Sequence, residues 1–279
     1  TAANLDTLTT VGTDMITMHV SAGSVAATVL TSLEGKTGVA VDAALVNEIT
    51  GAAAEIAAVV DNAQITTAVD YAATVSGDLV NADLANLIKI SNDTTGVVTA
   101  SITDTAANLD TLTTVGTDMI TMHVSAGSVA ATVLTSLEGK TGVAVDAALV
   151  NEITGAAAEI AAVVDNAQIT TAADYAATVS GVAATTDLAL ITADTTGTVD
   201  CAGVTELTGT AAQIVAAFGV YGTLPADYAA TVSPALFNAD LANLIAISND
   251  TAGVVTAEIT DTAANLDTLT TVGTDMITM

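Results

Sequence analysis

The chain contains a long verbatim internal repeat. Its first part, Thr1–Ala68, returns without a change as Thr105–Ala172, displaced by 104 positions. The opening phrase Thr1–Met18 occurs a third time as Thr262–Met279. Such self-similarity is typical of repeat architectures, in which each unit buries its apolar surface against its neighbours. The sequence therefore predicts one continuous segment, 1–279, of a longer array, with repeats at 1–104 and 105–261 and a further copy starting at 262–279.

Short apolar–polar alternations recur within these repeats. Val98, Ala100 and Ile102, for example, alternate with Thr and Ser, as expected of a strand that buries one face. The last apolar residues of these phrases are 20–34 positions apart and are Val20, Val41, Val75, Ile102, Val124, Val145, Val179, Val199, Val232 and Ile259. They indicate about ten stacked units of roughly 26 residues.

A stretch compatible with a short helix follows each strand phrase. Asp104 or Thr105 is a candidate N-cap for TAANLDTL, and Ser128 for SVAATVLTSLEG. Strand, helix and parallel strand in succession predict an α/β solenoid, with a parallel sheet on one side and short helices on the other. The alternative is a β-solenoid, in which the Ala-rich stretches are strands and turns. Glycines at the expected corners, such as Gly38 and Gly142, fit both.

Composition narrows the class of protein further. Apolar residues make up 51% of the chain but aromatic residues only 2%, which favours thin aliphatic layers over a large irregular core. The net charge of −28 argues against nucleic acid and anionic membranes as partners. It suits a long, self-repelling polymer in salty surroundings. The single cysteine, Cys201, excludes an internal disulfide framework, and no apolar run is long enough for a transmembrane helix.

Acidic residues at the expected corners are candidate calcium ligands, because carboxylate oxygens suit this hard cation. Three lie in GTDM phrases, two in SND phrases and three directly after a strand: Asp14, Asp118 and Asp275; Asp93 and Asp250; Asp42, Asp146 and Asp200. Neither the EF-hand loop nor the glycine-rich calcium nonapeptide is present. The alternative is that these acids are helix caps and solvated charges. No other cofactor is expected.

Catalytic and copper-binding patterns are weak. Met15, Met18 and His19 recur as a group in the second copy, but Met18 is expected in the core and His19 on the exposed strand face. No nucleophile elbow occurs, and a site repeated in every period is typical of a scaffold, so we expect no enzyme activity. An enzyme would need a site that occurs once, and the unique stretch is 181–234. The tyrosines of the DYAATVS phrases, Tyr71, Tyr175 and Tyr228, are expected on strands at unit boundaries.

Several phrases resemble a known group of repeats. NDTTGVVTASITDTAANLDTL, KTGVAVDAALVNEITGAAAEIAAVV and DYAATVS are similar to the repeat regions of giant cell-surface proteins of marine cyanobacteria, of the type associated with swimming motility, and to those of large bacterial repeat adhesins. The resemblance implies a secreted, surface-attached fibrous protein, with calcium as a candidate linking ion. It brings no catalytic residues with it.

Two functions follow as hypotheses. The first is a structural segment of an extracellular fibre, surface layer or stalk that self-associates end to end or side to side, since an array has open sheet edges. The second is an adhesin module that holds carbohydrate or another surface on its Thr-rich sheet face. An outward Thr row that is essential for binding would indicate the second; self-association would indicate the first.

Overall fold

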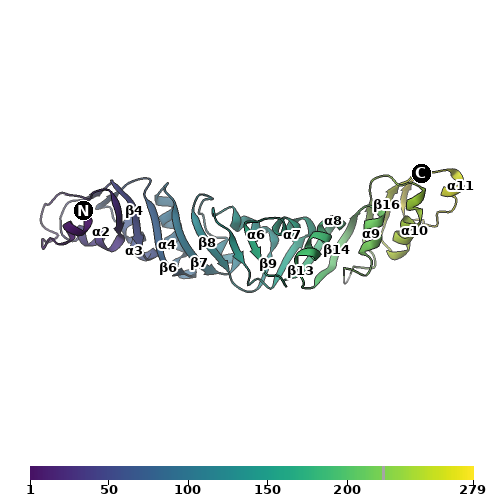
Figure 1. Ribbon diagram of the computed structural model, residues 1–279, viewed down its shortest axis with the longest axis horizontal. Coiled ribbons are helices and arrows are strands. Elements are labelled where there is room, and N and C mark those ends of the chain that lie inside the picture. The colour runs from purple at the N-terminus through teal and green to yellow at the C-terminus, as the bar shows by residue number, and fades with distance from the viewer. Residues whose placement is uncertain (222–223) are drawn as a thin grey trace. The chain divides into compact units, whose positions relative to one another are not determined.

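A computed structural model describes residues 1–221 and 224–279. The chain divides into two compact units, one formed by Thr1–Ser125 with Ser136–Ala147 and the other by Ala126–Thr135 with Ala148–Met279. Both units contain parallel strands connected by short helices, as Figure 1 shows. The chain therefore has an α/β fold with parallel sheets, as the sequence predicts.

The first unit alternates short strands with helices of four to ten residues. Its elements are α1 (Ala2–Asp6), β1 (Met18–His19), β2 (Gly23–Ala26), α2 (Ala27–Glu34), β3 (Val41–Ala43), β4 (Val46–Gly51), α3 (Ala53–Val60), β5 (Ile65–Thr67), β6 (Ala72–Leu79), the 3-10 helix η1 (Asn81–Asp83), α4 (Leu84–Asp93), β7 (Val98–Asp104), α5 (Ala106–Leu109), β8 (Met119–Val124) and β10 (Val145–Ala147).

Parallel pairing aligns equivalent residues of successive repeats in this unit. One sheet has the order β1-β3-β5, and another contains the run β10-β8-β7-β6-β4-β2. In the second sheet Val25 pairs with Ile49, Ile49 with Ala73, and Ala73 with Val98. All four side chains are buried, so the apolar face of each strand continues that of its neighbour.

The second unit repeats this arrangement. Its elements are β9 (Ser128–Ala130), β11 (Glu152–Ala156), α7 (Ala157–Val164), β12 (Ile169–Thr171), β13 (Ala176–Ala184), α8 (Thr185–Asp194), β14 (Val199–Gly209), α9 (Ala211–Ala217), β15 (Ala229–Val232), η2 (Asn238–Asp240), α10 (Leu241–Asp250), β16 (Val255–Glu258), α11 (Ala263–Leu266) and β17 (Met276–Thr278). Helix α6 (Ala131–Glu138) begins in this unit. The sheet order is β17-β16-β15-β14-β13-β11-β9, again parallel throughout.

The helices bury a narrow aliphatic stripe, as their spacing of apolar residues requires. Leu30 of α2, Ile56 of α3 and Leu87 of α4 are fully buried. Helices of this length do not persist alone in water, so packing against the strands holds them. The Ala-rich stretch of each repeat forms a helix, α3, α7 or α9. The alternative of a β-solenoid, which makes these stretches strands and turns, is wrong.

Several local predictions are also wrong. Ser128 does not cap α6 but lies in β9, where Val129 pairs with Ile153 of the neighbouring strand. Hydrogen bonds of the sheet therefore extend the strand to Ala130, and the helix starts only at Ala131. The pattern predicts one strand before each helix, whereas two short strands, such as β3 and β4 before α3, precede several of them.

Other predictions are confirmed. Thr105 caps α5 and accepts a hydrogen bond from the Asn108 N–H at 3.3 Å. Met18 and Met122 are buried, whereas His19 is exposed. No helix in the described part of the chain combines the length and apolar character that crossing a membrane requires.

Candidate functional site

In two copies of the phrase VGTDM, the aspartate carboxylate accepts hydrogen bonds from the preceding repeat. Asp118, 1% exposed, accepts hydrogen bonds from the Ser91 hydroxyl at 2.7 Å and from the Val98 N–H at 3.0 Å. It also accepts from the Val115 N–H of its own corner at 3.4 Å. Ser91 lies in the last turn of α4 and Val98 begins β7, so one carboxylate connects two successive repeats.

The equivalent corners show the same chemistry where a preceding repeat exists. Asp275 accepts from the Ser248 hydroxyl at 2.6 Å and from the Val255 N–H at 3.1 Å. The Asp14 carboxylate accepts from the Val11 N–H at 3.2 Å, and the Asp14 carbonyl accepts from the Thr37 hydroxyl at 3.1 Å and from the Gly38 N–H at 2.6 Å. The three predicted calcium ligands of the GTDM phrases therefore act as acceptors for protein donors.

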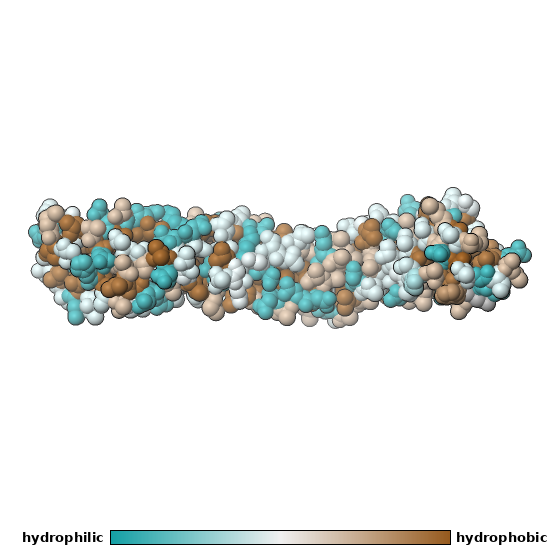
Figure 2. Space-filling model, turned by 90° about the horizontal axis from the view of Figure 1, so that it is seen from above, coloured by the Kyte–Doolittle hydropathy of each residue, from teal (hydrophilic) through white to brown (hydrophobic). Residues whose placement is uncertain are grey.

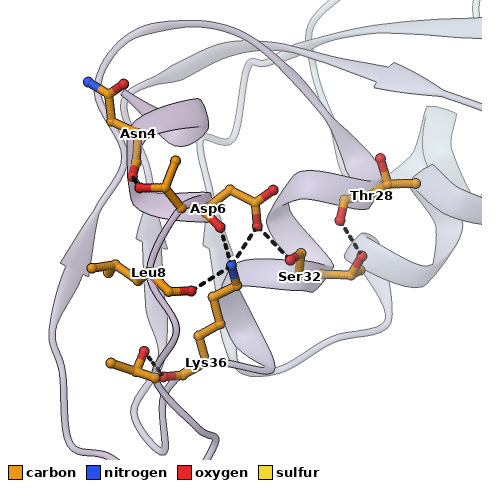
Figure 3. Close-up of polar contacts among 9 residues, drawn as sticks. Asn4, Asp6, Leu8, Thr28, Ser32 and Lys36 are labelled. Carbon is orange, nitrogen blue, oxygen red and sulfur yellow. Dashed lines mark hydrogen bonds and ion pairs between the residues drawn. The ribbon is translucent and has the colours of Figure 1, made fainter.

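Lys36 contacts Asp6 and Leu8 of the preceding repeat, as Figure 3 shows. Lys36 donates to the Asp6 carbonyl, lies 3.0 Å from the Asp6 carboxylate and donates to the Leu8 carbonyl at 3.0 Å. Ser32 donates to the same carboxylate at 2.6 Å. The hydroxyl of Ser32, and then the ammonium of Lys36, hold the pKa of Asp6 below its usual value. The second copy repeats these contacts with Asp110, Leu112, Ser136 and Lys140.

A third recurrent contact joins a tyrosine that lies just before a strand to the aspartate that ends the next α-helix. Tyr71 is buried just before β6 rather than on it, and its hydroxyl donates to the Asp93 carboxylate at 2.9 Å. Thr94 donates to the Tyr71 carbonyl at 2.5 Å and accepts from the Gly96 N–H at 3.0 Å. The same set recurs as Tyr175, Asp194, Thr195 and Gly197, and as Tyr228, Asp250, Thr251 and Gly253.

The position of the SND acids differs from the prediction. Asp93 and Asp250 are the last residues of α4 and α10, not loop corners or N-caps. A carboxylate at a helix C-terminus is electrostatically unfavourable, and the tyrosine hydroxyl compensates by donating to it. Burial, and then the nearby Asp93 carboxylate, raise the pKa of Tyr71 far above its usual value.

The remaining calcium candidates lie within strands rather than after them. Asp42 of β3 lies 2.8 Å from Nδ1 of His19 and accepts from the Ala44 N–H at 3.0 Å. The Ala44 N–H and then His19 hold the pKa of Asp42 below its usual value. Asp146 of β10 lies 2.8 Å from Nδ1 of His123. Asp200 of β14 accepts from the Ala202 N–H at 2.9 Å.

These acids are not brought together into one coordination sphere. No group of three or more His, Cys, Asp or Glu side chains with metal-binding geometry lies in residues 1–221 and 224–279. The carboxylates instead accept hydrogen bonds from hydroxyl and N–H groups at separate positions along the chain. Calcium binding stays a prediction.

The residues that complete these contacts are the ones that sequence reasoning missed. Ser91, Thr94, Thr141, Lys36 and Lys140 all connect successive repeats. A sequence signal exists for Thr94 and its equivalents Thr195 and Thr251, because threonine stands two residues before glycine in each DTTG or DTAG phrase. A hydroxyl that recurs at a fixed distance before a glycine is typical of a side chain that bonds the backbone of a turn.

The unique stretch 181–234 carries a cavity of about 500 Å³. It lies between α8 and α9 and is lined by Thr185, Thr186, Ala189, Leu190, Gln213, Ala216, Ala217 and Tyr221. These side chains offer no nucleophile beside a base. Cys201 is buried in the same stretch, and burial, followed by the Asp200 carboxylate, raises the pKa of its thiol to about 11. A protonated, buried thiol is a poor nucleophile.

Comparison with known proteins adds no assignment. No protein-family model, curated protein or solved structure matches the chain. The recurrent contacts between successive repeats are therefore the basis for any functional proposal.

Proposed function

We propose that this chain is a non-enzymatic structural segment of a giant extracellular fibre, surface layer or stalk, folded as a continuous α/β solenoid. The observation that carries the proposal is the recurrence of one set of contacts between successive repeats. The Ser–Asp contact occurs at Asp118 and Asp275, the Lys–Asp contact at Asp6 and Asp110, and the Tyr–Asp contact in three repeats. Nearest-neighbour contacts of this kind make stability additive along an array.

Surface chemistry supports the same proposal. The chain has 31 acidic and three basic residues, and two of the basic residues, Lys36 and Lys140, are committed to contacts between repeats. Figure 2 shows hydrophilic and apolar residues interspersed over the face that it presents. A strongly acidic surface keeps a long polymer dispersed through self-repulsion, and the salt of an extracellular medium screens that repulsion.

Immunogold electron microscopy of intact source cells tests the proposal, with an antibody raised against residues 119–138. We expect label along extracellular fibres or in a regular layer on the cell surface. Label that appears only after the cells are permeabilised would overturn the extracellular assignment. A matched antibody against residues 181–226 should decorate the same structures at fewer positions, because that stretch occurs once in this chain.

A further inference from the structure

The cavity between α8 and α9 lies where the succession of helices changes. Helix α8 has ten residues and ends at Asp194, as α4 ends at Asp93 and α10 at Asp250. A four-residue helix, α5 or α11, follows α4 and α10, whereas the seven-residue α9 follows α8. Helix α9 itself begins two residues after a glycine of positive φ, as α3 and α7 do. The residues of α8 and α9 can therefore be compared one by one with those of the other repeats.

Three residues that line the cavity are smaller than their equivalents. On α8, Thr185 stands where α4 and α10 have leucine, and Ala189 stands where both have isoleucine. On α9, Ala217 stands where α3 and α7 have valine. The larger equivalents are Leu84 and Leu241, Ile88 and Ile245, and Val59 and Val163. Smaller side chains on both walls account for the space of about 500 Å³ between the two helices.

The lining also differs from its equivalents in charge. Gln213 stands where α3 and α7 have glutamate, and Leu190 stands where α4 has lysine and α10 alanine. None of the described residues that line the cavity is charged, although the whole chain has a net charge of −28. A charged ligand would have to leave water here without an ionic partner, so the lining favours an uncharged one.

The cavity is accessible from solvent and offers few polar groups. Ala189 is exposed, and Leu190 is 40% exposed, so a ligand can reach the wall that α8 provides. The Thr210 N–H donates to the side-chain oxygen of Gln213 at 3.0 Å, which leaves the amide nitrogen as the group that Gln213 can offer to a ligand. An aliphatic wall beside an amide donor suits an apolar molecule that carries a carbonyl or hydroxyl oxygen.

We infer that the cavity between α8 and α9 binds an uncharged, mainly apolar small molecule. Its body packs against Ala189, Leu190 and Ala217, and its oxygen accepts a hydrogen bond from the Gln213 amide. Pockets that hold small ligands are about 300–1,000 Å³ in volume, mostly apolar and lined by a few polar groups, as this one is. Side chains that had changed only to admit α9 would fill the space between the helices, whereas these leave it open.

Nile red, an uncharged dye with a carbonyl oxygen and an emission that rises in apolar surroundings, is the probe. Titrated into the full chain, it should bind at a single saturable site. 1-Octanol should compete with the dye. Octanoate has the same number of carbon atoms but carries a carboxylate, so it should compete about tenfold less well or worse.

Ala189→Ile installs the residue that α4 and α10 have at this position and fills the cavity. It should weaken Nile red binding about tenfold or more, because the added atoms occupy the space of the dye. Ala58→Ile is the matched control, since it adds the same atoms to an exposed position of α3, and it should leave dye binding unchanged. Circular dichroism checks that each chain is folded.

Gln213→Glu provides a second variant that keeps the helix cap. A glutamate at the equivalent position of α3, Glu55, accepts from the Ala52 N–H at 2.9 Å, so the new carboxylate can cap α9 in the same way. The variant lacks the amide donor and should bind Nile red about fivefold more weakly. Gln64→Glu, at an exposed position after α3, controls for the added negative charge and should bind the dye as the unchanged chain does.

Equal dye binding by folded Ala189→Ile and Ala58→Ile chains, or equal competition by 1-octanol and octanoate, would overturn this site. Equal binding by the Gln213→Glu and Gln64→Glu chains would overturn the role of the amide. A fall in the bound fraction of dye as the chain concentration rises would show that a second copy occupies the cavity, and would also overturn the inference. These failures leave the proposed structural function untouched, because the immunogold experiment measures the location separately.

Discussion

The Ser91 hydroxyl donates to the buried Asp118 carboxylate at 2.7 Å across 27 residues of sequence. The same carboxylate accepts from the Val98 N–H, so it satisfies two donors of the preceding repeat. Because these donors satisfy its oxygens by hydrogen bonding, an aspartate with 1% exposure is tolerated in an aliphatic layer.

Replacement of this carboxylate should destabilise the fold. In Asp118→Asn an amide NH₂ faces a hydroxyl or N–H donor, so at least one hydrogen bond is lost in a buried position. We expect a loss of about 1–3 kcal/mol in the free energy of unfolding, measured by urea denaturation. Asp14→Asn is the matched control, because the Asp14 carboxylate accepts only from the Val11 N–H among the described residues, and it should cost less than about 1 kcal/mol. Equal losses in the two variants would contradict the role assigned to Ser91 and Val98.

Replacement of Lys140 should lower the free energy of unfolding by more than the loss of an exposed ion pair would. Its ammonium donates to two carbonyls of the preceding repeat, Asp110 and Leu112, and Lys140→Met leaves them without this donor. We expect a loss of about 1–2 kcal/mol. Lys89→Met is the control, because Lys89 forms an exposed pair with Asp61, worth at most about 1 kcal/mol.

Lys140→Met should also change how the free energy of unfolding falls at acid pH, here called the acid limb. The Ser136 hydroxyl, and then Lys140, lower the pKa of Asp110 in the folded state. That carboxylate therefore contributes stability above its unfolded pKa, near 3.8, which is lost as the pH falls through its folded value. The Lys140→Met chain should lose less stability between pH 5 and pH 2, at about the same ionic strength, than the unchanged chain. An identical acid limb in both chains would show that Lys140 does not act on Asp110.

Gly96 is required by a close backbone approach. A Cβ at this position would lie 2.3 Å from the Tyr71 carbonyl oxygen and 2.5 Å from that of Asp70. Gly96→Ala should therefore shift the backbone and cost about 1–3 kcal/mol in urea denaturation. Gly273→Ala is the control, since no atom lies within 4 Å of the added Cβ. A neutral effect of Gly96→Ala would show that the contact between the loop and Tyr71 is not maintained in solution.

The buried tyrosines predict that the folded chain loses stability at alkaline pH. Burial, and then the aspartate near each hydroxyl, raise the pKa of Tyr71, Tyr175 and Tyr228 above the ordinary value of 10.0. Since the folded pKa exceeds the unfolded one, this stabilisation is complete below about pH 10 and declines as the pH rises above it. Tyrosinate absorbance should therefore appear together with the loss of circular dichroism. Ionisation of these phenols near pH 10 in a chain that keeps its helices would contradict their burial.

Sequence reasoning predicted the class of fold because its signals are local. Alternation of Val, Ala and Ile with Thr identifies the strands, and Thr105 before an apolar stripe identifies a helix start, because each depends on neighbours along the chain. It missed the pairing of Ser91 with Asp118 and of Lys140 with Asp110, because the spacing between strand phrases varies from 20 to 34 residues. Unequal spacing leaves undetermined which hydroxyl or ammonium reaches which carboxylate.

The sequence by itself determined that three segments of this chain, Thr1–Met18, Thr105–Met122 and Thr262–Met279, have the same intrinsic conformational preferences, because they are identical. Only the tertiary structure decided that the Asp118 carboxylate of Thr105–Met122 is buried and accepts hydrogen bonds from Ser91 and Val98 of the preceding repeat. The physical reason is that burial and hydrogen bonding in a repeat depend on the neighbours on each side.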